Sequence, residues 1–485
     1  MSDNSRTYYP TIGLEIHAEL ATNTKMFCRC ANNAFDSEPN AHVCPVCMAH
    51  PGTLPVPNKQ AIEHVINVGL VVNGEVANFT EFDRKNYFYP DIPKGYQISQ
   101  YKYPIVSGGE LAGVKITRIH LEEDTATSQH SGNVSFINYN RAGVPLMELV
   151  TEPVIHSAEH AMEFAEELRL LLRTLGVSKA NMECGEMRVE VNISVSPDKE
   201  KFGTKVEIKN LNSFNVVGRA IAYEIKRMTD LYEDGRENEI VQETRGWDDT
   251  KQITFTQRRK EQSEDYRYFP EPDIPKLYLH EMFNIDEMRQ TLPELPEEKR
   301  NRYRNEYGIK DEDIESYINS RELAVLFENT IIAYPNDREL IKLTSNYITS
   351  DLVGLIKKGS SILENGEIKE IDFIKYIIPE HFATLIQMIG RGDISSRGAK
   401  DILAILATEG GNPEVIAKEK GLIQQHDESA LRNIATRVIT ENPTVVSDFK
   451  AGKENAIKFL VGQGMKVSNG SANPTILEKI LREMV

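Results

Sequence analysis

Apolar and polar residues alternate strictly in the first half of the chain, which predicts antiparallel strands with one buried face. In Thr11–Leu20 (TIGLEIHAEL) every second residue is apolar, so Glu15, His17 and Glu19 share the opposite face. Two further segments show the same alternation and are also predicted to be strands. They are Met187–Val195, with Arg188 and Glu190 on its polar face, and Thr204–Asn210, with Lys205, Glu207 and Lys209.

Helical spacing follows these strands and dominates the second half of the chain. Ser157 is placed to cap a helix that ends at Gly176, and a second helix is predicted after Ser213. The Pro-rich stretch 270–296 marks a domain boundary, beyond which strand signals fade. We therefore predict an α+β chain with an antiparallel-sheet domain at 1–292, a helical domain at 293–350 and a helical tail at 351–485.

Length and charge add limits to this picture. The 485 residues exceed what one hydrophobic core supports, which agrees with several domains. No stretch approaches the roughly 20 apolar residues of a membrane span, and the start lacks a secretory signal, so we expect a cytoplasmic or organelle-matrix protein with no membrane partner. The formal net charge is −17, but residues 391–485 hold 13 Lys/Arg against 12 Asp/Glu. Nucleic-acid binding stays possible there, because phosphate contacts respond to nearby charge.

Four of the five cysteines form two close pairs, Cys28-x-Cys30 and Cys44-x-x-Cys47. Two such pairs can hold one tetrahedral Zn²⁺. Because four thiolates leave no open coordination position, the metal is expected to be structural. The alternative is four reduced, buried cysteines. Cys184 stands alone and is expected to be packed rather than nucleophilic.

A second metal site is suggested by carboxylates near the first strand. Glu15 and His17 lie about 7 Å apart along its polar face. Further carboxylates occur in His120–Asp124 (HLEED) and Pro145–Glu152 (PLMELVTE). Oxygen ligands of this kind suit Mg²⁺. The alternative is a set of solvated acidic turns.

Cations and aromatic rings crowd Phe82–Gln100 (FDRKNYFYPDIPKGYQISQ), which contains Arg84, Lys85 and Lys94. Cations beside rings suit base stacking or phosphate binding, although a rigid Pro-anchored loop packed on the body explains the pattern slightly better. The chain has no G-x-x-x-x-G-K-[ST] loop and no Rossmann glycine pattern, so ATP would need another cradle, such as a concave antiparallel sheet. No amidase-type Gly/Ser-rich stretch is present, so any ammonia would come from a partner.

Several segments together resemble the GatB/GatE family, which includes the B subunits of aspartyl/glutamyl-tRNA(Asn/Gln) amidotransferases. They are GLEIHAEL, CPVCMAHPGTLPVPN, FDRKNYFYPDIPKGYQISQ, IHLEEDTA, NYNRAGVPLMELVTEP, GTKVEIKNLNSFN and DYRYFPEPDIP, followed in the tail by GRGDISSRGAKDIL and FLVGQGMKVSNGSANP. The first seven cover most of residues 10–275. The resemblance implies a glutamine-synthetase-like cradle at 1–292 with a zinc knuckle at 28–47, an all-α domain and a YqeY-like tRNA-binding tail.

The resemblance also implies an activity. The family's enzymes are three-subunit ligases that form carbon–nitrogen bonds with glutamine as the amido donor. An A subunit releases ammonia from glutamine, a small C subunit supports the assembly, and tRNA binds to the B subunit. With ATP and Mg²⁺ the B subunit phosphorylates the side-chain carboxylate of Glu-tRNA(Gln), Asp-tRNA(Asn) or both, and ammonia then displaces the phosphate.

Matched motif by motif, the resemblance assigns Mg²⁺ to His17 (GLEIH), Glu123 (LEED) and Glu148 (PLMEL), with Glu15 in support. Strict alternation, however, places Glu122 on the polar face, and a bulge or a strand end would be needed to bring Glu123 there. Glu122 is therefore the alternative Mg²⁺ ligand. The residues expected to contact ATP phosphate or the aminoacyl end are Lys85, Arg188, Glu190, Lys205 and Lys209. Structural zinc is expected at Cys28, Cys30, Cys44 and Cys47. The expected tRNA contacts are Lys453, Lys458 and Lys466.

Two hypotheses from other classes stay open. A non-catalytic, zinc-containing tRNA-binding protein would explain the cysteines and the tail. It gives no reason for His17 and the separate acidic segments to converge. A stand-alone ligase that uses free ammonia would need no glutaminase partner. Whether His17 lies close to those acidic segments therefore tests the hypothesis of a non-catalytic RNA-binding protein.

Overall fold

The computed structural model describes residues 6–35, 37–259, 266–359, 362–364, 367–369, 376–424, 428–468 and 472–485. The chain forms two compact units, Met1–Leu295 and Pro296–Val485. The first is rich in strands and the second is helical, which confirms the predicted α+β class. The units divide after Leu295, three residues beyond the boundary that the sequence predicted after residue 292.

A largely antiparallel sheet forms the first unit. Its strands lie in the order β15 (Ile253–Arg259), β14 (Glu243–Asp248), β13 (Val206–Leu211), β12 (Met187–Ser196), β1 (Tyr9–Glu19), β11 (Pro145–Thr151), β8 (Val114–Glu123), β6 (Val106–Ser107) and β2 (Glu75–Val76), and β7 (Glu110–Leu111) pairs with β8. β13 and β14 run parallel. The three strands predicted from alternation are β1, β12 and β13, and they are neighbours in this sheet.

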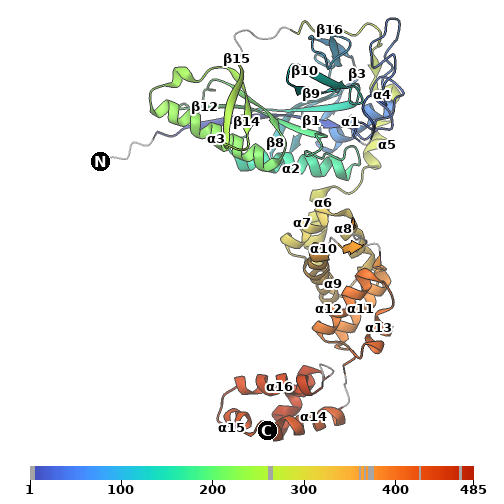
Figure 1. Ribbon diagram of the computed structural model, residues 1–485, viewed down its shortest axis with the longest axis vertical. Helices are drawn as coiled ribbons and strands as arrows, with labels where there is room; N and C mark the ends of the chain where they lie inside the picture. Colours follow the sequence, from blue (N-terminus) through green and yellow to red (C-terminus); the bar gives the residue numbers. More distant parts are fainter. Residues whose placement is uncertain are drawn as a thin grey trace. The chain divides into compact units, whose positions relative to one another are not determined.

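Helices cover the apolar face of the sheet. Alternate residues of β1, from Ile12 through Ala18, are at most 1% exposed, as the alternation predicted. Helices α2 (Ala158–Thr174) and α3 (Phe214–Glu233) lie along this face (Figure 1), and their buried residues share one core with β1. The side chain of Ser157 accepts a hydrogen bond from a first-turn N–H group and caps α2, as predicted. Ser213 caps α3 in the same way, and α3 begins where a helix was predicted. The polar face of β1 is thereby left for Glu15 and His17.

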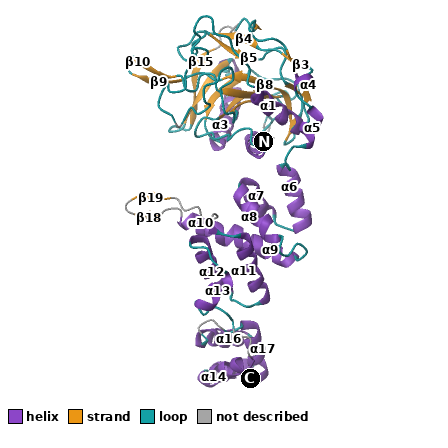
Figure 2. Cartoon of the chain, turned by 90° about the vertical axis from the view of Figure 1, so that its right-hand side faces the viewer, coloured by secondary structure: helices purple, strands orange, loops and turns teal. Residues whose placement is uncertain are grey.

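Smaller elements complete the first unit. Strands β16 (Phe269–Pro270), β4 (Asp83–Asn86) and β5 (Tyr96–Ser99) form a sheet, and hydrogen bonds from β5 to Glu122 and Glu123 join it to β8. The other elements are helix α1 (Lys59–Val71), the pair β3 (Phe79–Thr80) and β17 (Leu277–Tyr278), η1 (Glu237–Glu239), α4 (Leu279–Met282) and α5 (Ile285–Gln290). Strands β9 (Thr127–Ser131) and β10 (Val134–Asn138) form a projecting hairpin (Figure 2).

Helices build the second unit. They are α6 (Pro296–Arg302), η2 (Tyr303–Tyr307), α7 (Asp311–Asn319), α8 (Arg321–Ile331), α9 (Arg338–Asn346), η3 (Tyr347–Leu352), α10 (Val353–Gly359), α11 (Pro379–Arg391), α12 (Ser396–Thr408), α13 (Pro413–Glu419), α14 (Glu428–Glu441), α15 (Pro443–Lys450), α16 (Asn455–Val467) and α17 (Pro474–Met484), and β18 (Ile362–Glu364) pairs with β19 (Glu367–Lys369). One hydrophobic cluster extends from Tyr303 to Ala417 and another from Leu431 to Leu481. The first cluster continues across the boundary predicted at 350/351. Among the described residues, no helix is long and apolar enough to cross a membrane.

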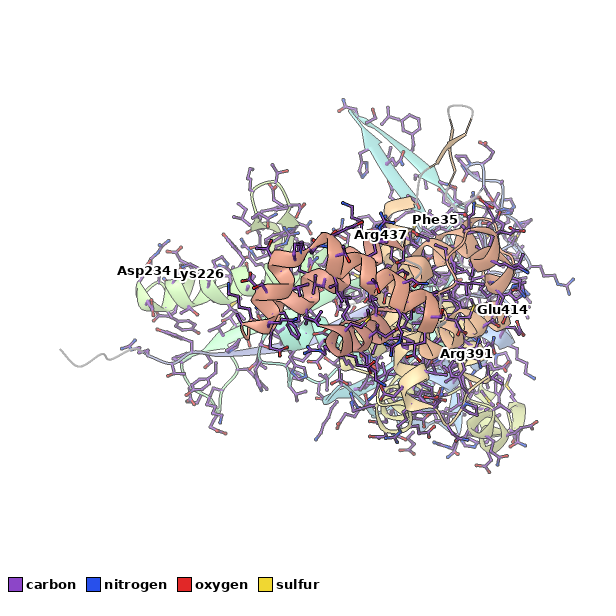
Figure 3. All side chains as sticks on the ribbon, turned by 90° about the horizontal axis from the view of Figure 1, so that it is seen from below. Phe35, Lys226, Asp234, Arg391, Glu414 and Arg437 are labelled. Atoms are coloured by element: carbon purple, nitrogen blue, oxygen red, sulfur yellow. The ribbon has the colours of Figure 1, made fainter. Side chains whose placement is uncertain are left out.

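Exposed ion pairs contribute little to either unit. In α3, Lys226 Nζ lies 2.7 Å from Asp230 Oδ2, and in α14, Arg437 Nε lies 2.8 Å from Glu441 Oε1. The side chains of Lys226 and Arg437 stand out from their helices (Figure 3). Exposed pairs of this kind typically add between zero and about 1 kcal/mol. Stability therefore depends mainly on the hydrophobic cores.

Gly203 provides a test of packing beside the sheet. A Cβ on Gly203 would overlap the carbonyl oxygen of Val195 in β12, whereas a Cβ on Gly13 would make ordinary contacts, the nearest 3.6 Å from Pro153 Cα. We expect Gly203→Ala to lower the free energy of unfolding of the first unit by about 1–3 kcal/mol, and Gly13→Ala to leave it nearly unchanged. Fluorescence of Trp247, the single tryptophan, reports urea unfolding of this unit. Equal midpoints for the two variants would contradict the expected clash.

Candidate metal and phosphate site

The register of the sheet brings four polar residues into one row. His17 on β1 pairs with Glu148 on β11 and with Arg188 on β12, and Glu148 pairs with His120 on β8. Directly paired residues of neighbouring strands point to the same face with Cβ atoms about 5 Å apart. Residues from three distant parts of the sequence therefore meet on the polar face.

Carboxylates surround the ring of His17. Its Nε2 lies 3.3 Å from Glu148 Oε2, 3.6 Å from Glu122 Oε1 and 3.8 Å from Glu15 Oε1. A second imidazole approaches the same group, with His120 Nε2 3.4 Å from Glu148 Oε2. Ligand atoms of Glu15, His17 and Glu148 lie within 4.8 Å of one another, and so do those of His120, Glu122 and Glu148. Carboxylate oxygens with an imidazole nitrogen at this spacing fit a divalent cation.

The pKa values of these groups show how their charges are balanced. Burial and the charge of Glu148 raise the pKa of Glu15 to about 7. Burial by itself would lower the pKa of His17, but Glu148 and Glu122 outweigh it and raise this pKa to about 9. Burial would raise the pKa of Glu148, yet His120 and His17 hold it well below its ordinary value. A proton on His17 thus compensates the carboxylates, and a divalent cation can take over that role.

His120 was not among the site residues predicted from the sequence. It is 2% exposed, and its strand also carries Arg118, whose Nη2 lies 3.7 Å from Glu148 Oε1. Alternation places His120 on the same face as Glu122. The alternation that placed Glu122 on the polar face therefore also placed His120 there, and it could have identified His120 as a site residue.

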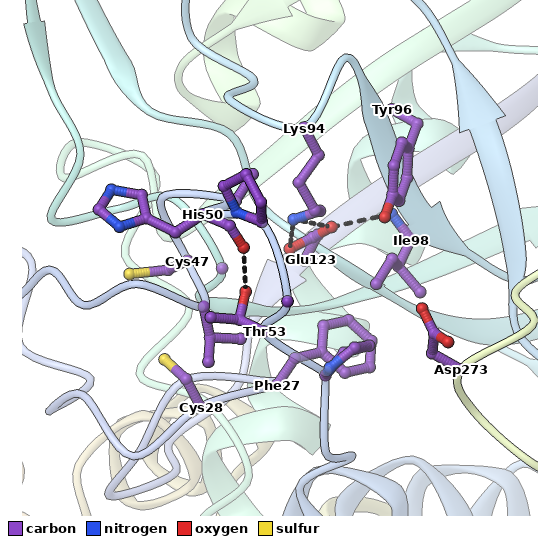
Figure 4. Close-up of a pocket in the computed structure, with 16 residues that line it drawn as sticks. Phe27, Cys28, Cys47, His50, Thr53, Lys94, Tyr96, Ile98, Glu123 and Asp273 are labelled. Carbon is purple, nitrogen blue, oxygen red and sulfur yellow. Dashed lines mark hydrogen bonds and ion pairs between the residues drawn. The ribbon is translucent and has the colours of Figure 1, made fainter.

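Glu123, assigned to Mg²⁺ from the resemblance, lies outside the group around His17. Its carboxylate accepts hydrogen bonds from Lys94 Nζ at 2.7 Å and from the backbone N–H of Ile98 at 2.9 Å. It lines a pocket of about 250 Å³ (Figure 4). The pairing of β8 with β11 is regular at Glu122 and Glu123 and shifts only near Thr151. With no bulge at this point, Glu122 rather than Glu123 faces His17.

Charged residues on β12 and β13 flank the group on one side. Glu190 lies opposite Glu15 in the register. Lys209 Nζ lies 2.7 Å from Glu190 Oε2 and 3.2 Å from Glu207 Oε1. Lys205 is exposed and precedes the start of β13. Lys209 therefore forms ion pairs with the carboxylates of β12 and β13, and Lys205 lies outside the strand.

Arg188, the other basic residue predicted on β12, is held by a buried carboxylate. Its Nη2 lies 3.1 Å from Asp124 Oδ2, and Arg141 Nε lies 2.7 Å from the same oxygen. Burial would raise the pKa of Asp124, but Arg188 and Arg141 hold it below its ordinary value. Arg188 thus has an anionic partner within the protein.

Lys85, on the small sheet that joins β8, also interacts with the acidic group. It lies on β4, with Nζ 5.1 Å from the centre of the Tyr266 ring. Burial would lower the pKa of Lys85, but the charges of Glu122 and Glu148 outweigh it and raise this pKa. Lys85 therefore stays a cation beside the carboxylates.

The four grouped cysteines form a separate cluster. Their sulfur atoms all lie within 4.8 Å of one another. The Sγ atoms of Cys44 and Cys47 are 3.8 Å apart, and a tetrahedral site with Zn–S bonds of about 2.3 Å places its sulfurs about 3.8 Å apart. A hydrogen bond with Cys28 lowers the pKa of Cys47 to about 5. The cluster fits one Zn²⁺.

The remaining predicted residues lie elsewhere. Cys184, which was expected to be packed, is exposed, and the amide of Asn181 approaches its sulfur at 3.2 Å. The expectation of packing was wrong because Cys184 lies in a short turn before β12. The tail lysines Lys453, Lys458 and Lys466 are exposed in the second unit, the last two on α16.

Comparison with known proteins agrees with this architecture. Residues 10–284 match the GatB/GatE catalytic domain, and residues 325–485 match the GatB domain. Three similar proteins are each named as the B subunit of an aspartyl/glutamyl-tRNA(Asn/Gln) amidotransferase. That of Persephonella marina is 43% identical over 99% of both chains, and that of Carboxydothermus hydrogenoformans is 42% identical over 99% of both. That of Gloeothece citriformis is 41% identical over 98% of this chain and 97% of its own. The chain belongs to the GatB family, the family of the B subunits of aspartyl/glutamyl-tRNA(Asn/Gln) amidotransferases.

Proposed function

We propose that the chain activates misacylated tRNA for amidation as the B subunit of a glutamine-dependent, three-subunit ligase. A side-chain carboxylate of Glu-tRNA(Gln), Asp-tRNA(Asn) or both attacks the γ-phosphorus of ATP, and ADP leaves. Ammonia from a glutaminase A subunit then attacks the acyl carbon, phosphate leaves, and the nitrogen loses a proton. A small C subunit completes the assembly, which works in the cytoplasm or an organelle matrix.

The observation that carries this proposal is the set of carboxylates within 3.8 Å of His17 Nε2. A free carboxylate resists ammonia because oxide is a very poor leaving group, and phosphorylation supplies a good one. A phosphoryl-transfer site has to gather divalent metal at the reacting oxygens. A protein that only binds RNA gives no reason to bury carboxylates together, since burial of charge is costly.

Glu15, His17, Glu122 and Glu148 would hold Mg²⁺, with Glu122 in place of Glu123. Bound Mg²⁺ would supply positive charge to the oxygens of the transferring phosphoryl group. His17 has to release its proton to act as a ligand, and that proton's charge is then replaced by the metal. The three carboxylates would provide oxygen ligands for the metal on the polar face, and Glu15, whose pKa is raised to about 7, would release any proton as the metal binds.

The flanking residues take different parts in the proposal. Lys85 and Lys209 are cations beside the acidic group and are proposed to contact ATP phosphate or the aminoacyl end. Arg188 and Glu190 are held in ion pairs with Asp124 and Lys209, which suits a positioning role. Lys205 stays a proposed contact at the exposed rim.

Two further parts of the chain have supporting roles. Cys28, Cys30, Cys44 and Cys47 would hold structural Zn²⁺, which stabilises the surrounding loop and takes no part in amidation. Lys453, Lys458 and Lys466 would contact tRNA phosphates, because they are exposed cations on a helical tail.

Replacement of His17 tests the kinase site. With ATP, glutamine and Mg²⁺, the wild-type complex is expected to convert Glu-tRNA or Asp-tRNA to the amide. His17→Ala is expected to lower amidation at least about a hundredfold, since even residues behind metal ligands affect activity 10–100-fold. Hydrolysis of glutamine should continue. His130→Ala, at an exposed hairpin position, is the control. Normal amidation by His17→Ala would show that the metal site is elsewhere.

The two neighbouring glutamates of β8 can be separated by their metal dependence. Glu122→Gln removes a charge 3.6 Å from His17 Nε2 and is expected to raise the Mg²⁺ concentration for half-maximal, tRNA-dependent ATP hydrolysis about tenfold. Glu123→Gln breaks the buried ion pair with Lys94, which lies outside the group around His17, and is expected to change that concentration less than about twofold because the two sites share no partner. Titration of ATPase activity with Mg²⁺ measures both. The reverse order of effects would return Glu123 to the metal site.

Zinc content tests the cysteine cluster. The purified protein is expected to hold about one zinc per chain by elemental mass spectrometry. Cys47→Ser should lose most of this metal and lower the thermal midpoint of the first unit, because four ligands are needed for a closed site. Cys184→Ser should retain the zinc. Wild-type protein with far less than one zinc per chain would refute the assignment.

A further inference from the structure

Three tyrosines form a continuous aromatic group at the edge of the first unit, here called the tyrosine platform: Tyr101, Tyr266 and Tyr268. The rings of Tyr101 and Tyr268 are stacked, with centroids 4.5 Å apart and planes 13° apart. Tyr266 meets Tyr268 edge to face at 6.0 Å. Tyr101 is 61% exposed, so a further flat group can stack on the face that Tyr268 does not cover.

Backbone contacts hold the platform in place. The carboxylate of Asp83, itself 5% exposed, accepts a hydrogen bond from the backbone N–H of Tyr101 at 2.9 Å. The side-chain amide of Asn86 donates to the carbonyl oxygens of Tyr266 and Arg267 at 3.1 and 2.9 Å. Both supports lie on β4, so the two halves of the platform, far apart in sequence, are fixed to one strand.

The platform adjoins the proposed phosphoryl-transfer site. Lys85, on the same strand, lies with Nζ 5.1 Å from the centre of the Tyr266 ring, and the charges of Glu122 and Glu148 raise its pKa. Burial is the main reason that the pKa of Tyr268 rises to about 12, and the charges of Glu122 and Glu148 add to it. A group stacked on the platform would therefore stand next to the place where the carboxylate of the substrate has to react.

We propose that the tyrosine platform is the subsite for the single-stranded 3′ end of the aminoacyl-tRNA, whose terminal bases stack on Tyr101. This inference rests on the proposed function, because the aminoacyl ester is attached to the terminal ribose and its side chain has to reach the acidic group. Stacking on tyrosine suits single-stranded RNA, since every base offers a flat face. Exposed Lys102, next to Tyr101, is placed for the neighbouring phosphates.

The order of the strands favours the tRNA end over the base of ATP. The acidic group spans β1, β11 and β8 of the large sheet, and β12 and β13 lie beyond β1. β5 and β4 belong to a separate sheet, which a hydrogen bond from Ser99 on β5 to Glu122 joins to β8. Attacking and leaving oxygens lie roughly in line during phosphoryl transfer, so the two substrates have to approach from opposite sides. The β12–β13 side carries Lys209 among polar groups, which suits a triphosphate. The aromatic, exposed side suits an RNA end that enters from solvent.

Replacement of Tyr101 in the assembled three-subunit enzyme tests the inference. Tyr101→Ala is expected to raise the KM for aminoacyl-tRNA about tenfold, equivalent to about 1.4 kcal/mol, and to leave the KM for ATP within twofold. Tyr101→Trp and Tyr101→Phe keep a flat ring and should restore the KM. Tyr278→Ala, a 51% exposed tyrosine against Phe79, is the matched control and should have no effect.

A binding measurement separates this inference from the proposed function. A tRNA with 2-aminopurine in place of the terminal adenine should lose fluorescence when it binds wild-type enzyme, and should lose much less with Tyr101→Ala. This quenching needs no turnover, so it would support the platform even if the enzyme formed no amide. A rise in the KM for ATP instead of tRNA, or equal quenching by wild type and Tyr101→Ala, would overturn the inference.

Discussion

Carboxylates concentrated around one histidine are the constraint on which the first unit depends. Glu122 and Glu148 are 3% and 5% exposed, and both approach His17 within 3.6 Å. Like charges removed from water repel each other and lose hydration, so cations or hydrogen bonds have to compensate them. His17 and His120 do so directly and Lys85 does so from the flank. Glu122 and Glu148 are therefore held close together by the positive charge and hydrogen-bonding groups around them.

The sheet makes this arrangement possible because it separates its two faces completely. The apolar face of β1 is sealed by the core that it shares with α2 and α3, which fixes the strand in register. A shift by one residue would turn Ile16 toward solvent and His17 into that core, so hydrophobic burial also holds the polar row in place. The alternation of apolar and polar residues along β1 thus produces both the packed core on one face and the charged row on the other.

The cysteine cluster is connected to this row through its neighbours. Lys25, fully buried, donates hydrogen bonds to the carbonyl oxygens of His42 and Tyr139, and Met26 N–H donates to the carbonyl oxygen of Gly143. The segment from Tyr139 to Gly143 leads directly into β11, the strand of Glu148. A metal that tightened the cysteine loop would therefore also steady the start of this strand, at a distance from any reacting group.

The sequence by itself determined the features that depend on nearby residues. Alternation identified β1 and β12, a serine cap and apolar spacing located α2, and close spacing grouped the four cysteines, because side-chain direction and capping follow local geometry. Alternation also put Glu122 and His120 on one face, but only the tertiary structure decided that this face meets His17, and that Lys209 rather than Lys205 reaches Glu190. It also placed Tyr101 against Tyr268 and carried one helical core past residue 350. Such contacts join residues far apart along the chain, and strand order and register, which no local pattern encodes, bring them together.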